Sequence, residues 1–318
     1  MRKFATYLSG ITLCIIVLLL LIPAISIFLK YPMRLSEYSS LFESNYTAYF
    51  LLLSFILLVI NACFYKYVGL GRKLLRFNML LSTLFIISQI VFISVIYITA
   101  KKNNVTVSFS KALVRPGYRD NPHTTYTYCT VYNQRQLLDV YLPGDTSGEP
   151  STPVVVIHGG GFVSGNRAQE KYTHAWFTQH RCTVFSIDYP LGTKDRQTWE
   201  SAANAVATAM SFIVKNAARF HVDPNKIILA GGSAGGALAI QTALGLLNNY
   251  VRTYDSTPAP VPAGIIAMYP PVNLTDLWHK MKAGQTVDLT DAATKYLGGG
   301  PSEFPERYEQ VDLINHLF

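Results

Sequence analysis

The chain has 318 residues, half of them apolar, and a formal net charge of +8. Residues 1–100 hold eight Lys and Arg against two Glu, so +6 of this charge lies there and only +2 in the remainder. Such a concentration of basic residues around apolar segments is typical of membrane topology, and it argues against a nucleic-acid-binding surface.

Three apolar runs without a charged residue occupy this first part of the chain, at Leu8–Leu29, Tyr46–Tyr65 and Phe77–Ala100. Each is close to the roughly 20 residues that a membrane-spanning helix needs. The first is too long for the apolar core of a typical signal peptide, and no small-residue cleavage motif follows it. The sequence therefore predicts a three-helix transmembrane anchor over residues 1–100.

The basic residues also predict an orientation. They are concentrated at the N-terminus and in the second loop: Arg2, Lys3, Lys66, Arg72, Lys73 and Arg76. The positive-inside rule places both regions in the cytoplasm, although Lys101 and Lys102 favour the opposite orientation. We therefore expect a multi-pass protein of the cell membrane whose part after Ala100 is extracytoplasmic.

The four cysteines do not suggest a disulfide framework. Cys14 and Cys63 lie in the expected spans, and Cys129 and Cys182 lie in expected strands. We interpret them as small buried apolar residues. No spacing of side chains indicates a metal or an organic cofactor.

A linker is expected at residues 101–123, followed by a single domain at residues 124–318. Two alternating runs between Thr124 and Leu142 flank Asn133-Gln134 and predict an antiparallel hairpin. The pattern then changes to short continuous apolar runs, which are typical of strands buried on both faces. These runs are Pro153–Ile157, Cys182–Ile187, Lys226–Ala230 and Ala263–Met268.

Helical stretches alternate with these strands, at about Arg167–Gln179, Thr198–Phe220 and Ala234–Tyr250. Alternation of this kind predicts right-handed crossovers and a mostly parallel sheet with the hairpin as its antiparallel edge. After Met268 the pattern is weaker, with one possible short helix between Ala283 and Pro301.

The stretch Gly231-Gly232-Ser233-Ala234-Gly235 fits the pattern G-x-S-x-G where an expected strand meets an expected helix. Small residues permit the sharp turn that exposes a nucleophilic serine, and the helix N-terminus points its amides at the site. Glycine-rich turns after strands also occur without a catalytic role, so the motif alone leaves both interpretations open.

A second motif, His158-Gly159-Gly160-Gly161-Phe162, directly follows the run Pro153–Ile157. Consecutive glycines allow backbone N–H groups to face a substrate carbonyl. A flexible turn is the structural alternative, while a phosphate-binding Walker loop is excluded because no G-K-[ST] follows. We expect His158 to organise the loop rather than to act as a base.

In this order, the two motifs resemble the α/β-hydrolase superfamily. They are most similar to HGGG-type esterases and lipases, which include carboxylesterases and the feruloyl and acetyl-xylan esterase-like branch. Ser164-Gly165, Asp188-Tyr189 and Asp223-Pro224 add to the likeness, which covers roughly Tyr126–Phe318 and not the apolar runs. The sequence departs at Gly232, where many relatives of the lipase-like branch have Asp.

This resemblance implies a serine hydrolase for small carboxylic esters. Ser233 would attack the ester carbonyl and form an acyl-enzyme, and the amides of Gly159, Gly160 and Ala234 would hold the oxyanion. The flanking glycines Gly161, Gly231 and Gly235 would support the two turns. The oligomeric state cannot be read from the sequence.

In such hydrolases an acid and then a histidine follow the serine in chain order. The tail from Pro301 resembles the segment before the acid-bearing strand, so we expect a chain truncated at its C-terminus. Asp312 and His316 have the right order but lie on one short segment. The remaining candidates are His279, in a lid-like stretch, and three histidines expected on the surface: His174, His180 and His221.

A missing base leaves two alternatives of different classes. In the first, the chain is a truncated membrane-anchored esterase whose intact form is active, and these 318 residues show little activity. In the second, it is a hydrolase-fold module that binds a ligand or partner outside the membrane without cleaving it. A transporter is disfavoured, because the apolar runs contain no charged residue to mark a pathway.

Overall fold

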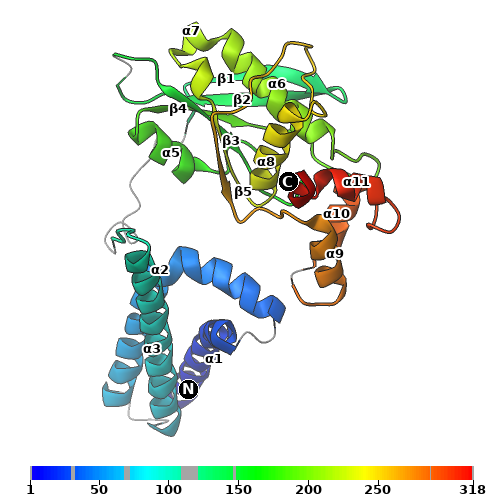
Figure 1. Cartoon of the computed structure of the whole chain (residues 1–318). Helices are drawn as coiled ribbons and strands as arrows, with labels where there is room; N and C mark the ends of the chain where they lie inside the picture. Colours follow the sequence, from blue (N-terminus) through cyan, green and yellow to red (C-terminus); the bar gives the residue numbers. More distant parts are fainter. Residues whose placement is uncertain are drawn as a thin grey trace. The chain divides into compact units, whose positions relative to one another are not determined.

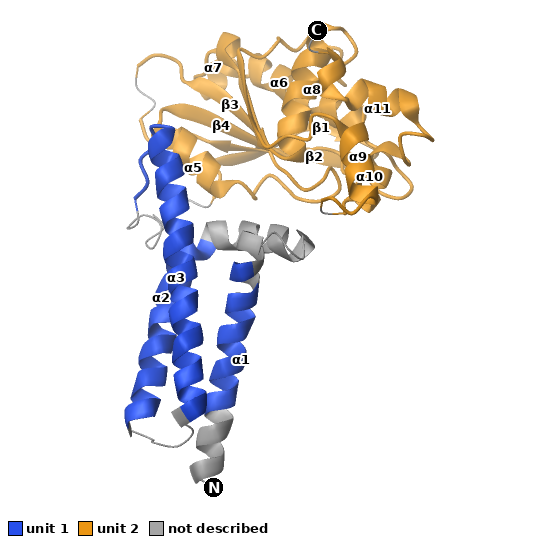
Figure 2. Ribbon diagram, turned by 60° about the horizontal axis from the view of Figure 1, so that its bottom comes forward, with its two compact units in different colours: residues 1–117 blue, residues 118–318 orange. Residues whose placement is uncertain are grey.

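The computed structural model describes residues 2–29, 33–67, 72–108, 121–145, 148–286 and 288–316. Side chains are described from residue 10 onward within these ranges, apart from residues 23, 26–45, 67 and 72. The chain divides into two compact units, which we call the N-terminal unit (Met1–Gly117) and the C-terminal unit (Tyr118–Phe318) (Figure 2).

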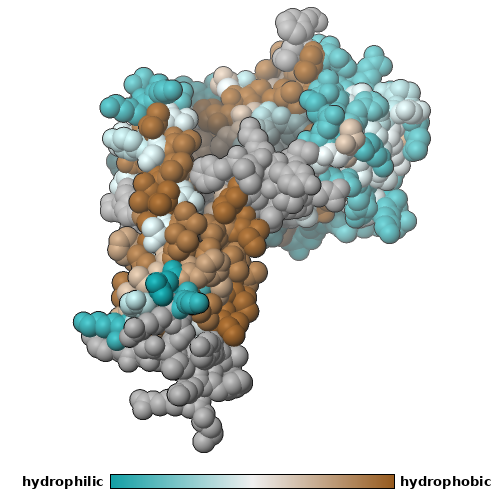
Figure 3. All heavy atoms as spheres, turned by 90° about the horizontal axis from the view of Figure 1, so that it is seen from below, coloured by the Kyte–Doolittle hydropathy of each residue, from teal (hydrophilic) through white to brown (hydrophobic). Residues whose placement is uncertain are grey.

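The described part of the N-terminal unit consists of three helices that pack against one another. These are α1 (Arg2–Leu29), α2 (Met33–Tyr67) and α3 (Arg72–Lys102). Val17, Leu57 and Phe85 form its buried centre, and the Asn78 side chain donates a hydrogen bond of 2.9 Å to the carbonyl of Gly10. Its outer surface is also apolar (Figure 3), with exposed residues that include Leu19, Leu52, Phe55, Leu80, Ile87 and Val95.

Two helical segments of this unit are long and apolar enough to cross a membrane, Tyr46–Lys66 and Lys73–Lys102. The described apolar part of α1, Gly10–Ile22, is shorter. Among the described residues the structure therefore supports two candidate spans and not the three that we expected. Residues 109–120 of the expected linker lie outside the described residues.

The C-terminal unit is built on a mixed sheet, in which six strands are described (Figure 1). The strands are β1 (Thr124–Val131), β2 (Gln134–Tyr141), β3 (Thr152–Ile157), β4 (Cys182–Ile187), β5 (Ile228–Gly232) and β6 (Gly264–Met268). Their order is β1-β2-β4-β3-β5-β6, with β1 and β2 antiparallel and the other four parallel. The predicted hairpin and the four predicted strands that follow it are present. β3, β4 and β5 are buried as expected. β6 is not, since its Ile265, Ile266 and Met268 are 40 %, 41 % and 39 % exposed.

Helices cover the sheet or follow its last strand. They are α5 (Lys171–Gln179), α6 (Ser201–Lys215), α7 (Ala217–Phe220), α8 (Ala234–Leu247), α9 (Leu274–Lys282), α10 (Thr290–Leu297) and α11 (Pro305–Val311). The predicted helix Thr198–Phe220 is divided between α6 and α7, because Asn216 leaves helical geometry with φ −110°. The sequence predicted neither α9 nor α11.

Alternate residues of the central strands face two different helical layers. Val155 and Ile157 of β3 belong to the main core, with residues of α6 and α8, whereas Val154 and Val156 pack on the opposite face with Phe177 of α5 (Figure 1). Burial on both faces explains why β3 is apolar at every position after Thr152 rather than at every second one.

Helix α8 approaches the end of β3 without any intervening side chain. A Cβ on Gly235 would clash with the carbonyl oxygen of Ile157 and lie 2.7 Å from that of His158. Only glycine therefore allows the first turn of α8 to occupy this position, directly against the backbone of the strand.

In contrast to our expectation, His174 is not on the surface. It is 2 % exposed, faces inward from α5 together with Phe177, and lies against Tyr141 with ring centroids 4.7 Å apart. Neither ring nitrogen has a hydrogen-bond partner among the described residues. Burial lowers the pKa of His174 to about 4, although Asp139 acts in the opposite direction.

The cysteines also differ from the prediction. All four are free thiols; Cys63 is exposed, and the other three are half-buried rather than buried. Because the outer surface of the N-terminal unit is itself apolar, an apolar environment at Cys63 does not require burial within the protein.

Gly235→Ala tests the close approach of α8 to β3. Because the added methyl meets a backbone carbonyl, we expect the free energy of unfolding to fall by about 3 kcal/mol, the upper end for overpacking. Gly144→Ala is the control, because no atom of the described residues lies within 4 Å of the new Cβ, and it should change this free energy by less than about 0.5 kcal/mol. All three tryptophans lie in the C-terminal unit, so their fluorescence reports its unfolding in the full chain. Equal stability of the two variants would contradict the proposed contact.

His174→Phe tests the buried neutral imidazole. The pKa of an unperturbed histidine is 6.5 and that of His174 in the folded chain is about 4, so the stability is complete above pH 6.5 and declines as the pH falls toward 4. The loss amounts to about 3 kcal/mol, at 1.36 kcal/mol per pKa unit. We expect the variant to lose correspondingly less stability between pH 7 and pH 4 in denaturant titrations. Parallel pH profiles for the two proteins would show that His174 is not the responsible group.

Candidate active site

Ser233 occupies the turn between β5 and α8. Its backbone has φ 52° and ψ −124°, a combination that costs a non-glycine residue of order 1–3 kcal/mol. Two hydrogen bonds hold this conformation: the Ser233 amide donates to Met268 O of β6 (2.9 Å), and its carbonyl accepts from the Ala237 amide (3.0 Å). The serine is thus fixed at the carboxyl end of the parallel strands.

The glycine loop after β3 stands directly beside the serine. A Cβ placed on Gly159 would lie 3.7 Å from Ser233 Cβ. Gly160 has φ 120°, where a side chain would also strike the carbonyl of Ser164. The Gly160 carbonyl accepts from the amides of Val163 and Ser164, both at 3.1 Å, which closes the loop into a tight turn.

Three backbone amides of these two turns are available to a ligand. Within the described part of the chain, the N–H groups of Gly159, Gly160 and Ala234 donate no hydrogen bond to a protein acceptor. Ala234 is in addition the first residue of α8, where the positive end of the helix dipole lies. The structure places Gly159 beside Ser233, and Ala234 directly follows the serine in the chain. The role of the three amides as oxyanion donors stays a prediction.

His158 is turned into the protein. It is 1 % exposed, its Nδ1 donates to the Gly159 carbonyl (2.6 Å), and its ring stacks on Tyr189 with centroids 4.3 Å apart. The Tyr189 hydroxyl in turn donates to the His158 carbonyl (3.0 Å). Burial lowers the pKa of His158, so the neutral ring is favoured. This geometry suits a residue that shapes the glycine loop.

An ion cluster supports the segment that follows the loop. The Arg167 guanidinium lies 2.9 Å from Asp139 of β2 and 2.8 Å from Asp188, which follows β4. The Arg167 amide also donates to the Asp188 carboxylate (2.9 Å), and these carboxylates raise the pKa of Arg167 despite its desolvation. The cluster therefore fixes the segment that follows the glycine loop to β2 and to the end of β4.

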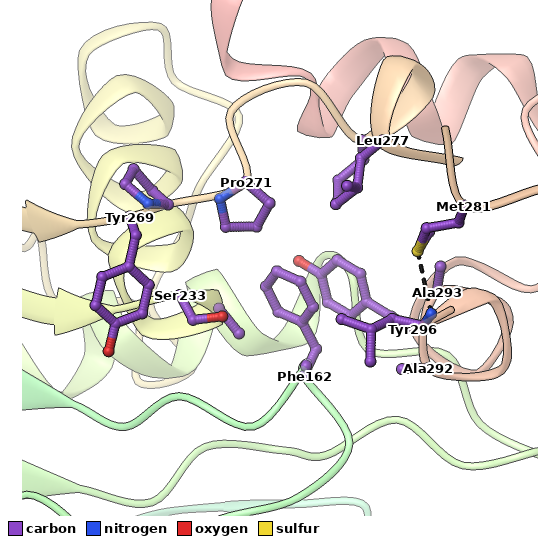
Figure 4. Close-up of a pocket in the computed structure, with 14 residues that line it drawn as sticks. Phe162, Ser233, Tyr269, Pro271, Leu277, Met281, Ala292, Ala293 and Tyr296 are labelled. Atoms are coloured by element: carbon purple, nitrogen blue, oxygen red, sulfur yellow. Dashed lines mark hydrogen bonds between the residues drawn. The ribbon is translucent and has the colours of Figure 1, made fainter. Parts of the chain in front are cut away.

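A cavity of about 320 Å³ opens at the serine (Figure 4). Ser233 lies between Tyr269 on one side and Phe162 and Tyr296 on the other, and its hydroxyl points toward the latter pair (Figure 4). Gly161 of the glycine loop and Ala234 of the serine turn also line it. The other described lining residues are apolar and come from the segment after β6, from α9, and from α10 with the residue before it: Pro270, Pro271, Leu274, Leu277, Met281, Leu289, Ala292 and Ala293.

Tyr269 lies beside Gly232, the position at which the sequence departs from many relatives. A Cβ on Gly232 would lie 2.8 Å from the Tyr269 hydroxyl and 3.1 Å from its ring carbon Cζ. These atoms are the far end of an exposed side chain, so the contact does not require glycine at position 232. Tyr269 is itself 79 % exposed and has φ 41°, an unusual conformation for a bulky residue.

The structure does not bring a histidine to the serine. All seven histidines are described, and none forms a hydrogen bond with Ser233; His180, His221 and His279 are exposed. His316 Nε2 donates to the Gln310 carbonyl (3.0 Å). Asp312 accepts from the amides of Leu274 (2.5 Å) and Thr275 (3.2 Å), so it caps α9 instead of orienting a base.

Sequence reasoning missed the cavity residues Phe162, Tyr269 and Tyr296. Two of them carried a signal: Phe162 directly follows the glycines, and Tyr269 directly follows the last strand, at the sheet edge where the serine also lies. Parallel strands place their carboxyl ends together, which could have pointed to Tyr269. Tyr296 on α10 had no such signal.

The sequence is similar to known esterases and lipases over its second part. It is 30 % identical to hormone-sensitive lipase of Ictidomys tridecemlineatus over 177 residues, which is 53 % of this chain and 22 % of that protein. It is 31 % identical to acetyl esterase of Salmonella agona over 114 residues, 36 % of this chain and 34 % of the other. The chain thus spans about a fifth to a third of the length of these relatives.

Among solved structures, Thermogutta terrifontis esterase 2 phosphorylated by paraoxon matches 48 % of this chain and 58 % of its own, with 26 % identity and a TM-score of 0.43. The profile of the BD-FAE family matches residues 138–317, more than half of the chain and nearly all of the C-terminal unit. Together with the mixed sheet and its flanking helices, this match identifies an α/β-hydrolase fold of the esterase and lipase type. The chain belongs to the BD-FAE family.

Proposed function

We propose that the C-terminal unit is a serine hydrolase of carboxylic esters. One observation carries the proposal: the strained Ser233 faces the cavity beside the unpaired amides of Gly159, Gly160 and Ala234. A nucleophile and an oxyanion site next to each other are what acyl transfer requires.

The reaction follows from this arrangement. Ser233 Oγ loses its proton as it bonds to the ester carbonyl carbon, and the negative charge that develops on the carbonyl oxygen is held by the three amides. When this intermediate collapses, the bond to the alkoxide oxygen breaks, and the alkoxide takes up that proton and leaves as the alcohol. Water then attacks the acyl group on Ser233, which gives the carboxylic acid and returns a proton to Ser233 Oγ. Each oxyanion donor contributes about 2.7–4 kcal/mol to such a transition state.

The N-terminal unit serves in this proposal as a membrane anchor. Two candidate spans and an apolar outer surface support it, since lipid favours exposed Leu, Ile and Phe that water does not. The basic residues of the second loop then orient the C-terminal unit toward the extracytoplasmic side.

A second candidate function is a binding module that does not cleave its ligand. It is favoured by one observation, the lack of a hydrogen bond between Ser233 and any of the seven histidines. A serine hydroxyl without a general base is a weak nucleophile at neutral pH.

Ser233→Ala separates the two candidates in the full chain, purified in detergent. If Ser233 is an activated nucleophile, we expect the variant to lose roughly a thousandfold or more in kcat/KM for p-nitrophenyl butyrate. Ser302→Ala, at an exposed serine away from the cavity, is the matched control and should retain the activity. Equal rates for the Ser233→Ala variant and the original chain, both folded, would reject the hydrolase and favour the binding module.

A further inference from the structure

The interior of the cavity offers almost no polar contact beyond the serine turn and the glycine loop. None of the lining residues that the structure describes is charged. The Tyr269 hydroxyl points away from the cavity (Figure 4), and the Tyr296 hydroxyl donates to Gln241 Oε1 (3.1 Å). A sugar or a charged group would lose its hydrogen bonds to water here without replacement. The chemistry of the lining therefore suits an aliphatic chain.

The floor of the cavity is rigid. The rings of Phe162 and Tyr296 stack with centroids 3.9 Å apart and an interplanar angle of 11°. Both are buried, at 6 % and 1 % exposure. Burial raises the pKa of Tyr296 well above its usual value, so the hydroxyl stays neutral and hydrogen-bonded. A substrate cannot displace this pair to gain space.

The far wall is formed by α9 and α10, which are tied to each other. The amide of Leu289, just before α10, donates to Met281 Sδ of α9 at 3.2 Å, and Met281 is 4 % exposed. Ala292 and Ala293 of α10 line the cavity from this wall (Figure 4). Ala292 also lies against the glycine loop, since a Cβ added to Gly161 would be 3.5 Å from the Cβ of Ala292.

Two consecutive alanines at this place leave open the space that larger residues would fill. The volume of about 320 Å³ lies at the lower end of the range for small-molecule pockets, about 300–1,000 Å³. We therefore expect an unbranched chain of medium length, about eight carbons, with the ester group at Ser233.

We propose that Ala292 and Ala293 determine the chain length of the ester, and that the site takes uncharged aliphatic esters of medium length. The inference rests on the proposed function for its kinetic part, and on the cavity alone for its binding part. Each methylene that is fully buried in the cavity should raise kcat/KM by up to about fourfold, until the space is filled.

The kinetic experiment compares kcat/KM along two series, p-nitrophenyl esters from acetate to decanoate and acetates from methyl to octyl. In one of the two series we expect kcat/KM for the eight-carbon ester to be at least ten times that for the shortest ester. The series that shows this preference tells whether the acyl chain or the alcohol chain enters the cavity.

Ala293→Phe should lower this ratio of kcat/KM values at least tenfold. Thr294→Phe, the next residue of α10 and exposed, is the matched control and should leave the ratio as it is. Leu277→Ala, which enlarges the cavity, should shift the optimum to longer chains.

A binding experiment keeps the inference separate from catalysis. We would titrate the Ser233→Ala chain with octanoate and with octan-1-ol in a calorimeter, and we expect saturable binding of one of them. This binding should be lost when Ala293→Phe is added to Ser233→Ala. It should be kept when Thr294→Phe is added instead. If the Ser233→Ala chain binds one of these compounds but the original chain hydrolyses no ester, the proposed function is rejected. The assignment of the cavity to a medium-length aliphatic chain is then supported. Hydrolysis that depends on Ser233 but is equal for all chain lengths, or unaffected by Ala293→Phe and Leu277→Ala, would overturn the cavity assignment and leave the proposed function standing.

Discussion

The site depends on one backbone contact, the first turn of α8 against the carboxyl end of β3. Because Gly235 has no side chain, the helix begins directly beside the Ile157 carbonyl, and the turn before it is forced into the strained geometry of Ser233. Gly159 lies beside the serine in this arrangement, since a Cβ added to it would be 3.7 Å from Ser233 Cβ. A wider spacing of helix and strand would separate nucleophile from amides and remove the candidate oxyanion site.

The strained backbone of Ser233 persists because the surrounding structure holds it from several sides. The sheet holds one side through the hydrogen bond to Met268, and the core holds α8 on the other. The glycine loop is shaped independently by the buried pair of His158 and Tyr189, and its far end is fixed by the ion cluster of Arg167. Rigid supports of this kind allow a polar site to stay organised before any ligand arrives.

Much of this could be predicted from the sequence. Continuous apolar runs such as Pro153–Ile157 identify strands buried on both faces. Two glycine motifs that follow such strands lie at the same edge of the sheet if the strands are parallel, and they meet here because β3 and β5 are neighbours. The cavity could not be predicted. Helix α9 is short, and the position of Tyr269 depends on a positive φ that no sequence pattern indicates. The burial of His174 was missed, although its spacing of three from Phe177 puts both on one face of α5. The described part of α1 proved shorter than a span.

The stacked floor of the cavity has a consequence for how the protein folds. Phe162 follows β3, whereas Tyr296 lies on α10, after the last strand of the described sheet. Contacts between such distant parts of a chain form late, because the loop entropy must be lost first. The cavity therefore forms only when the chain has folded, and a compound that fills it binds only the folded chain. By mass action, such a compound at a hundred times its Kd would stabilise the fold by about 2.7 kcal/mol and so act as a folding aid during production of the protein.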